Sequence, residues 1–129
     1  MKKILVFIFF ILSSSLFTVC EAQDVLMLSF NGANGKNPFG SLILSGNKFY
    51  GMTKEGGANN GGNVFSIDTN GTNYADLWDF QYGMTTNGAY PYGSLIIEGN
   101  KLYGMTEAGG ANAGGIIFSL DTAGGGRSI

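Results

Sequence analysis

The sequence has no histidine and a single cysteine, Cys20, among its 129 residues. Without histidine there is no histidine general base, no Ser-His-Asp triad and no imidazole ligand for a metal. Charged residues make up only 12% of the chain, and no basic run is present that would attract a phosphate backbone. These absences exclude the commonest hydrolytic and zinc chemistries, and they argue against nucleic-acid binding.

The N-terminus has the pattern of an export signal. Two lysines precede an apolar run over residues 4–19, which is too short to span a bilayer comfortably, and a small residue follows at Ala22. We therefore expect a signal peptide at residues 1–22 and a secreted, extracytoplasmic or cell-surface location, without membrane attachment after cleavage. An uncleaved N-terminal anchor is the alternative. Lipid attachment at Cys20 is disfavoured, because the bulky Val19 precedes it.

Removal of residues 1–22 changes the composition. Five basic and eight acidic residues remain, and no cysteine is left to form a disulfide. All 22 glycines lie in the remaining part, a density that indicates tight turns and close backbone approach more than helices. The length allows one modest domain.

The most informative feature is an internal repeat. Residues 38–72 and 91–125 align without a gap at an offset of 53, and 23 of the 35 positions are identical. Turn residues are kept as identities, whereas the apolar positions between them are kept by class. What the two copies share is therefore a backbone path and a core face.

Each copy divides into four short strands, because apolar and polar residues alternate between turn signals. A Gly-Asn pair at 46–47 and again at 99–100 predicts a two-residue hairpin between the second and third strands. The expected units are 24–72 and 73–125, with 126–129 as the start of a further, truncated unit. The expected strands are 24–30, 41–45, 48–53 and 63–68 in the first unit, and 74–80, 94–98, 101–106 and 116–121 in the second.

Four strands in about 50 residues, repeated in tandem, are typical of the blades of a β-propeller. The predicted fold is therefore all-β, with two four-stranded antiparallel propeller-like blades in an incomplete propeller; a β-solenoid or small sandwich is the alternative. Two blades alone leave apolar faces in water. We therefore expect further repeats of the same kind or self-association.

The motifs resemble a known family. F-N-G-x-x-G-x-N-P at 30–38, G-S-L-I at 40–43 and 93–96, and Y-G-M-T at 50–53 and 103–106 are similar to the GloVer (Gloeobacter/Verrucomicrobia) tandem repeat. The resemblance implies a propeller-like, exported bacterial protein, and it brings no catalytic residues. Members carry many copies, often before an anchoring domain, whereas this chain has two.

Few residues are candidates for chemistry. Asp68 and Asp121 occupy equivalent strand ends, where a turn role is favoured over a calcium or catalytic role because the position is repeated. The glycine loop at 56–62 lacks the lysine of a phosphate-binding loop. Aromatic side chains in the second unit could stack on sugar rings, although packing is the favoured interpretation: Trp78, Tyr82, Tyr90 and Tyr92.

We therefore expect no enzyme, cofactor or metal site, and a surface or secreted module that binds glycan or protein. One alternative is a fragment of an extracellular glycan-degrading propeller enzyme whose carboxylates lie partly in other blades. Another is a truncated chain without independent function.

Overall fold

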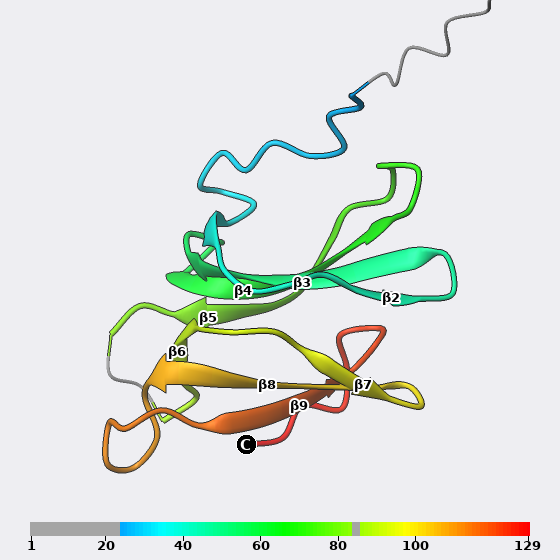
Figure 1. The fold of residues 1–129 in the computed structure, drawn as a ribbon. Coiled ribbons are helices and arrows are strands. Elements are labelled where there is room, and N and C mark those ends of the chain that lie inside the picture. Colours follow the sequence, from blue (N-terminus) through cyan, green and yellow to red (C-terminus); the bar gives the residue numbers. More distant parts are fainter. Residues whose placement is uncertain (1–23, 84–85) are drawn as a thin grey trace, which may run out of the picture.

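The computed structural model describes residues 24–83 and 86–129 (Figure 1). The signal peptide expected at residues 1–22 lies outside the described residues. Within the described ranges every regular element is a β-strand, and no helix is long and apolar enough to cross a membrane. The strands are β1 (Lys36–Pro38), β2 (Ile43–Ser45), β3 (Lys48–Glu55), β4 (Asn60–Asp68), β5 (Ala75–Gln81), β6 (Ala89–Pro91), β7 (Ile96–Glu98), β8 (Lys101–Ala108) and β9 (Ile117–Asp121).

The strands form two antiparallel sheets that face each other (Figure 1). In the first sheet β1 and β2 pair with different parts of β3, β4 pairs with β3, and β5 pairs with β4. In the second sheet β6 and β7 pair with β8 in the same way, and β9 pairs with β8. The expected all-β, antiparallel architecture is confirmed.

The Gly-Asn connections form the predicted hairpins. Ser45 lies opposite Lys48, so the turn between β2 and β3 has two residues, and the register repeats between β7 and β8. Only the glycine of each pair has a positive φ, 60° at Gly46 and 57° at Gly99. A glycine at the first central position matches the twist of the flanking strands.

The strand that was expected to open the second unit belongs to the first sheet. β5 pairs with β4, with Ala75 opposite Ser66. An isolated bridge between Ser119 and Ser128 reproduces this pair 53 residues later. The segment after each sequence repeat thus pairs with the fourth strand of that repeat and adds to its sheet.

Residues 24–30 were expected to form a strand, and the structure shows none there. The segment nevertheless packs as β5 does. Phe30 meets the ring of Phe65 edge-on at 5.3 Å between centroids, and Phe80 of β5 meets Phe118 in the same way at 5.1 Å. Residues 24–30 therefore lie where a strand of a preceding sheet would lie, without the neighbouring strand that would pair with them.

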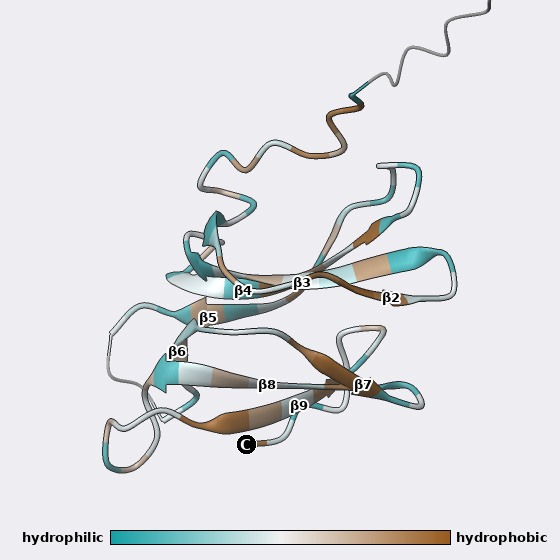
Figure 2. Ribbon diagram, viewed as in Figure 1, coloured by the Kyte–Doolittle hydropathy of each residue, from teal (hydrophilic) through white to brown (hydrophobic). Residues whose placement is uncertain are grey.

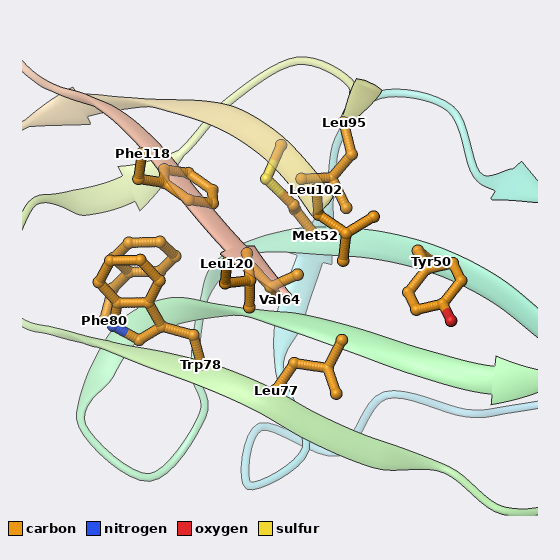
Figure 3. Packing of buried hydrophobic residues seen from close by; sticks show 10 residues of the cluster. All are labelled: Tyr50, Met52, Val64, Leu77, Trp78, Phe80, Leu95, Leu102, Phe118 and Leu120. Atoms are coloured by element: carbon orange, nitrogen blue, oxygen red, sulfur yellow. The ribbon is translucent and has the colours of Figure 1, made fainter. Parts of the chain in front are cut away.

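The core lies between the two sheets (Figure 3). Trp78 and Phe80 of β5 stack at 4.7 Å, and both meet Phe118 of β9 edge-on. Aromatic pairs of this geometry each contribute about 0.5–1.5 kcal/mol beyond the burial of their area. The first sheet contributes Tyr50, Met52, Val64, Leu77, Trp78 and Phe80, and the second contributes Leu95, Leu102, Phe118 and Leu120.

Equivalent positions of the two units lie side by side. A Cβ on Gly40 would overlap the carbonyl of Gly93, so glycine is required where the two turns meet. Four pairs separated by 53 residues are in contact, and we call them the ladder: Phe39 with Tyr92, Gly40 with Gly93, Ser41 with Ser94, and Lys54 with Glu107. The two units are therefore related by a displacement that places equivalent residues next to each other.

Candidate binding cleft

A cleft of about 530 Å³ opens at one end of the two sheets, where β3 and β8 end and β5 gives way to a loop. Its walls come from both units, so the cleft exists only because the sheets are packed together. The lining combines two aromatic rings with charged and amide side chains: Lys36, Lys54, Glu55, Asn60, Tyr82, Tyr90 and Glu107, together with the backbone of Gly32 and Gly56.

Two ion pairs line the cleft. Lys54 Nζ lies 2.5 Å from a carboxylate oxygen of Glu107, and Lys36 Nζ lies 3.4 Å from one of Glu55. The hydrogen bond to Glu107 raises the pKa of Lys54 above its ordinary value. The same ammonium lies 5.4 Å from the ring centroid of Tyr92. The cleft thus presents fixed donors and acceptors beside aromatic faces.

Tyr82 and Tyr90 meet edge to face, with 6.0 Å between their ring centroids and an interplanar angle of 89°. Tyr82 is 67% exposed, and its backbone amide donates to the carbonyl of Asn59 at 2.9 Å, which fixes its position. Partial burial raises the pKa of the Tyr90 hydroxyl. The pair therefore offers one accessible ring held in place by another.

The backbone at Tyr90 is strained. Its φ is 57°, in the left-handed region, and the equivalent residue of the first unit, Asn37, has a φ of 54°. The repeat has this conformation in β1 and in β6, and asparagine adopts it at a lower cost than tyrosine. A left-handed tyrosine costs on the order of 1–2 kcal/mol. Such strain is commonly kept where a side chain has a role beyond folding.

Tyr82 also lies outside the regular repeat. Between Phe80 and Gly88 the second unit has a longer connection than the first unit has between Phe30 and Gly35. Residues 84–85 of this connection fall outside the described ranges. The longer connection of the second unit therefore contributes Tyr82 to the lining of the cleft.

The structure separates the four aromatic residues that the sequence singled out. Trp78 is 7% exposed and lies in the core between the sheets. Tyr92 is exposed and stacks on Phe39 in the ladder, with 5.3 Å between ring centroids. Only Tyr82 and Tyr90 come together in the cleft.

A polar network in the first unit was not anticipated from the sequence. Asn63 is fully buried; its amide nitrogen donates to Tyr74 and Asp76, and its amide oxygen accepts from Thr53 at 2.7 Å. The Tyr74 hydroxyl donates to the carbonyl of Asn34 at 2.9 Å. The network ties the turn before β1 to β4 and β5.

The carboxylates of β5 belong to this network or lie beside it. Burial, followed by the nearby charge of Asp79, raises the pKa of Asp76. Asp79 accepts from the backbone amide of Ala58 at 2.8 Å. The only sequence signal for the network is that Asn63 is replaced by Ile116 in the second unit.

Asp68 and Asp121 form ion pairs with strand lysines. Asp68 Oδ1 lies 2.5 Å from Lys48 Nζ, and Asp121 Oδ1 lies 3.1 Å from Lys101 Nζ. The bonds from Lys48 and then Asn73 lower the pKa of Asp68. Among the described residues, histidine, cysteine and carboxylate side chains form no group of three that could hold a metal ion.

The two facing sheets, built by one motif used twice, define a tandem-repeat all-β protein. The family described as the Gloeobacter/Verrucomicrobia repeat matches residues 15–129. The chain belongs to this family, as its G-S-L-I and Y-G-M-T motifs indicated. No curated protein and no solved structure matches the chain.

Proposed function

We propose that the chain is an exported, non-enzymatic β-repeat module that binds saccharide in the cleft at the end of the two sheets. The strained Tyr90 carries the proposal. The repeat accommodates its left-handed position with asparagine, yet the second unit keeps a tyrosine there and supports it with Tyr82.

The chemistry of the cleft suits a sugar. The apolar face of a pyranose ring packs against an aromatic side chain, and its hydroxyl groups exchange hydrogen bonds with charged and amide groups. Tyr82 supplies the exposed ring, while Lys54, Glu107 and Asn60 supply the polar groups. A carbohydrate leaves the two ion pairs in contact with solvent or hydroxyl groups, so it demands no burial of an unpaired charge.

The propeller-like arrangement is part of this proposal. The face-to-face packing of the two sheets, with equivalent residues in contact along the ladder, supports it, since neighbouring propeller blades pack on one another. The N-terminal pattern at residues 1–22 supports export. An extracytoplasmic glycan would then be accessible to the cleft.

The test is a glycan-array screen of the purified protein, followed by calorimetry with the best saccharide. Tyr82→Ala should weaken binding by about tenfold or more, the effect expected when a central aromatic contact is removed. Phe39→Ala, which removes an exposed aromatic side chain outside the cleft, should bind as the parent does. Absence of binding to every sugar, or equal binding by Tyr82→Ala, would contradict the proposal.

The same experiment examines the hydrolytic alternative. Asp76, whose pKa is raised by burial and then by the charge of Asp79, is the specific feature that favours an enzyme. Chromatography of the saccharide after prolonged incubation would then show shorter products. Their loss in Asp76→Asn, with binding unchanged, would replace the proposed binding role by a hydrolytic one.

A further inference from the structure

Each outer face of the molecule exposes apolar residues whose counterparts are buried at the interface between the two units. On the second sheet Met105 is 57% and Ile117 is 70% exposed. Their equivalents on the first sheet, Met52 and Val64, are 4% and 0% exposed, because the second sheet covers them. We call this outer surface the Met105 face; it comprises Ile96, Tyr103, Met105 and Ile117.

On the outer surface of the first sheet the exposed residue belongs to the first unit, and its buried counterpart belongs to the second. Leu95 is 2% exposed because it packs into the core, whereas its equivalent Leu42 is 52% exposed. A groove of about 360 Å³ lies beside Leu42, over Phe65 and Ile67, and residues 25–28 and Phe30 also line it. We call the exposed part of this surface, Leu42 and Leu44, the Leu42 face. Phe65 and Ile67 beside it are already buried, and Phe30 packs on Phe65. Figure 2 shows that β2, β7 and β9 are apolar strands.

The interface inside the chain shows how such faces pair. Met52 of the first sheet lies beside Leu95 and Leu102 of the second (Figure 3). By the 53-residue relation, Met105 is the counterpart of Met52, and Leu42 is the counterpart of Leu95. The exposed Met105 face therefore carries the counterparts of residues that pack on the counterpart of Leu42.

The ladder adds charge and backbone complementarity. Lys54 pairs with Glu107, so this position of the ladder has a cation in the first unit and an anion in the second. A second copy placed after the first would bring its Lys54 to this Glu107, and opposite charges would alternate at this position. Gly93 would likewise meet Gly40 of that copy, and nothing lies within 4 Å of a Cβ on Gly93 now.

We propose that copies of this chain associate head to tail, with the Met105 face of one copy on the Leu42 face of the next. Continuity with the internal interface and the alternating charge identify the occupant as a second copy. A head-to-tail contact forms a ring when its rotation closes. Because propellers close with about four to eight blades and each chain supplies two, a ring contains roughly two to four copies.

The test is the mass of the purified protein by sedimentation and light scattering over a roughly hundredfold range of concentration, since association follows mass action. The parent protein should form one closed particle of roughly two to four copies. A single-chain mass at every concentration would overturn the proposal, and it is the outcome expected if further units of a longer chain occupy these faces. Unlimited growth into filaments would overturn the ring.

Two variants locate the contact. Gly93→Ala should weaken association at least about tenfold by placing a methyl group against the next copy's turn. Ile117→Lys should abolish association, because the counterpart of Ile117 is fully buried and a lysine there would bury an unpaired charge. Unfolding curves must show that each variant still folds.

The interface between the two units also indicates which variants can serve as controls for these two substitutions. Gly99→Ala introduces a methyl group at another open, positive-φ glycine whose counterpart, Gly46, remains open although a unit follows it. Asn112→Lys introduces the charge in a loop whose counterpart, Asn59, remains exposed. Both controls should associate as the parent does. If Gly93→Ala and Ile117→Lys also do so, other surfaces mediate assembly and the proposal is wrong.

Discussion

Met52 and Met105 provide a controlled test of what the packing of the two units contributes. Both lie in a Y-G-M-T motif, on a central strand, directly opposite an aliphatic residue of the next strand. Replacing either with alanine removes the same atoms from the same local structure. The two sites differ in one respect, since Met52 is buried between the sheets and Met105 faces outward.

The expected effects follow from this difference. Met52→Ala loses nearly the full burial of a methionine, about 1.5–3 kcal/mol, and leaves a cavity that brings the cost to about 2–5 kcal/mol. Met105 already has more than half of its surface in water, so Met105→Ala should cost less than about 1 kcal/mol. The total free energy of unfolding of a domain of this size is about 5–15 kcal/mol. Met52→Ala should therefore lower the urea midpoint of unfolding strongly.

The assay is urea unfolding followed by Trp78 fluorescence, at protein concentrations where the particle is a single chain. Trp78 reports on the inter-sheet core because it contacts Phe118 across the interface. Equal losses in Met52→Ala and Met105→Ala would refute the reasoning, since they would show that the sheets do not cover one another. If copies associate, the cost of Met105→Ala should rise with protein concentration while that of Met52→Ala does not.

Two further predictions concern single positions. Ala113 has a φ of 58°, and its counterpart in the first unit is Asn60. Ala113→Asn should therefore raise the free energy of unfolding, measured by chemical denaturation, by about 0.5–1 kcal/mol. The control Ala111→Asn should leave it unchanged. The pKa of Asp68 is lowered by its bond from Lys48, so the ionised form stabilises the fold above the ordinary aspartate pKa of about 4, and this contribution is lost as pH falls through the folded-state pKa. Urea midpoints of Asp68→Asn should therefore fall less steeply with acidification than those of the parent, and parallel curves would contradict the assignment.

The local structure could be predicted because its signals are local. A Gly-Asn pair between alternating strands determines a two-residue hairpin whatever packs on it, and both such hairpins occur. The alternation in β9 likewise identifies its buried side, Phe118 and Leu120, whereas both sides of β4 are buried. The repeat adds that two units share one path, so an assignment in one unit checks the other.

The assignment of β5 was wrong because strand partners are not local. Apolar residues predict a strand at 74–80, but a strand pairs with whichever edge is free, and that edge belonged to the preceding unit. The same limitation explains residues 24–30. Their composition suits a strand, yet the described chain offers them an apolar face to pack on and no backbone edge to pair with.

The candidate site could be predicted only in part, since a list of aromatic residues does not distinguish burial from exposure. Trp78 and Tyr82 lie four residues apart, one in the core and one in the cleft. The strain at Tyr90 and the network around Asn63 depend on backbone angles and on contacts between distant segments. Composition carries neither kind of information.

Positions at which the two copies differ prove more informative than those at which they agree. Positions that are identical in the two copies are those that every unit needs in order to fold, such as the paired glycines of the ladder. Differences mark what each unit does in its own place: Lys54 against Glu107 gives an ion pair across the interface, and Asn37 against Tyr90 gives a strained ring in the cleft. A duplicated chain that only filled space would have no reason to alternate charge at one position of the ladder. The alternation is useful only if a cation of one unit meets an anion of the next, and this is the arrangement that head-to-tail copies would continue.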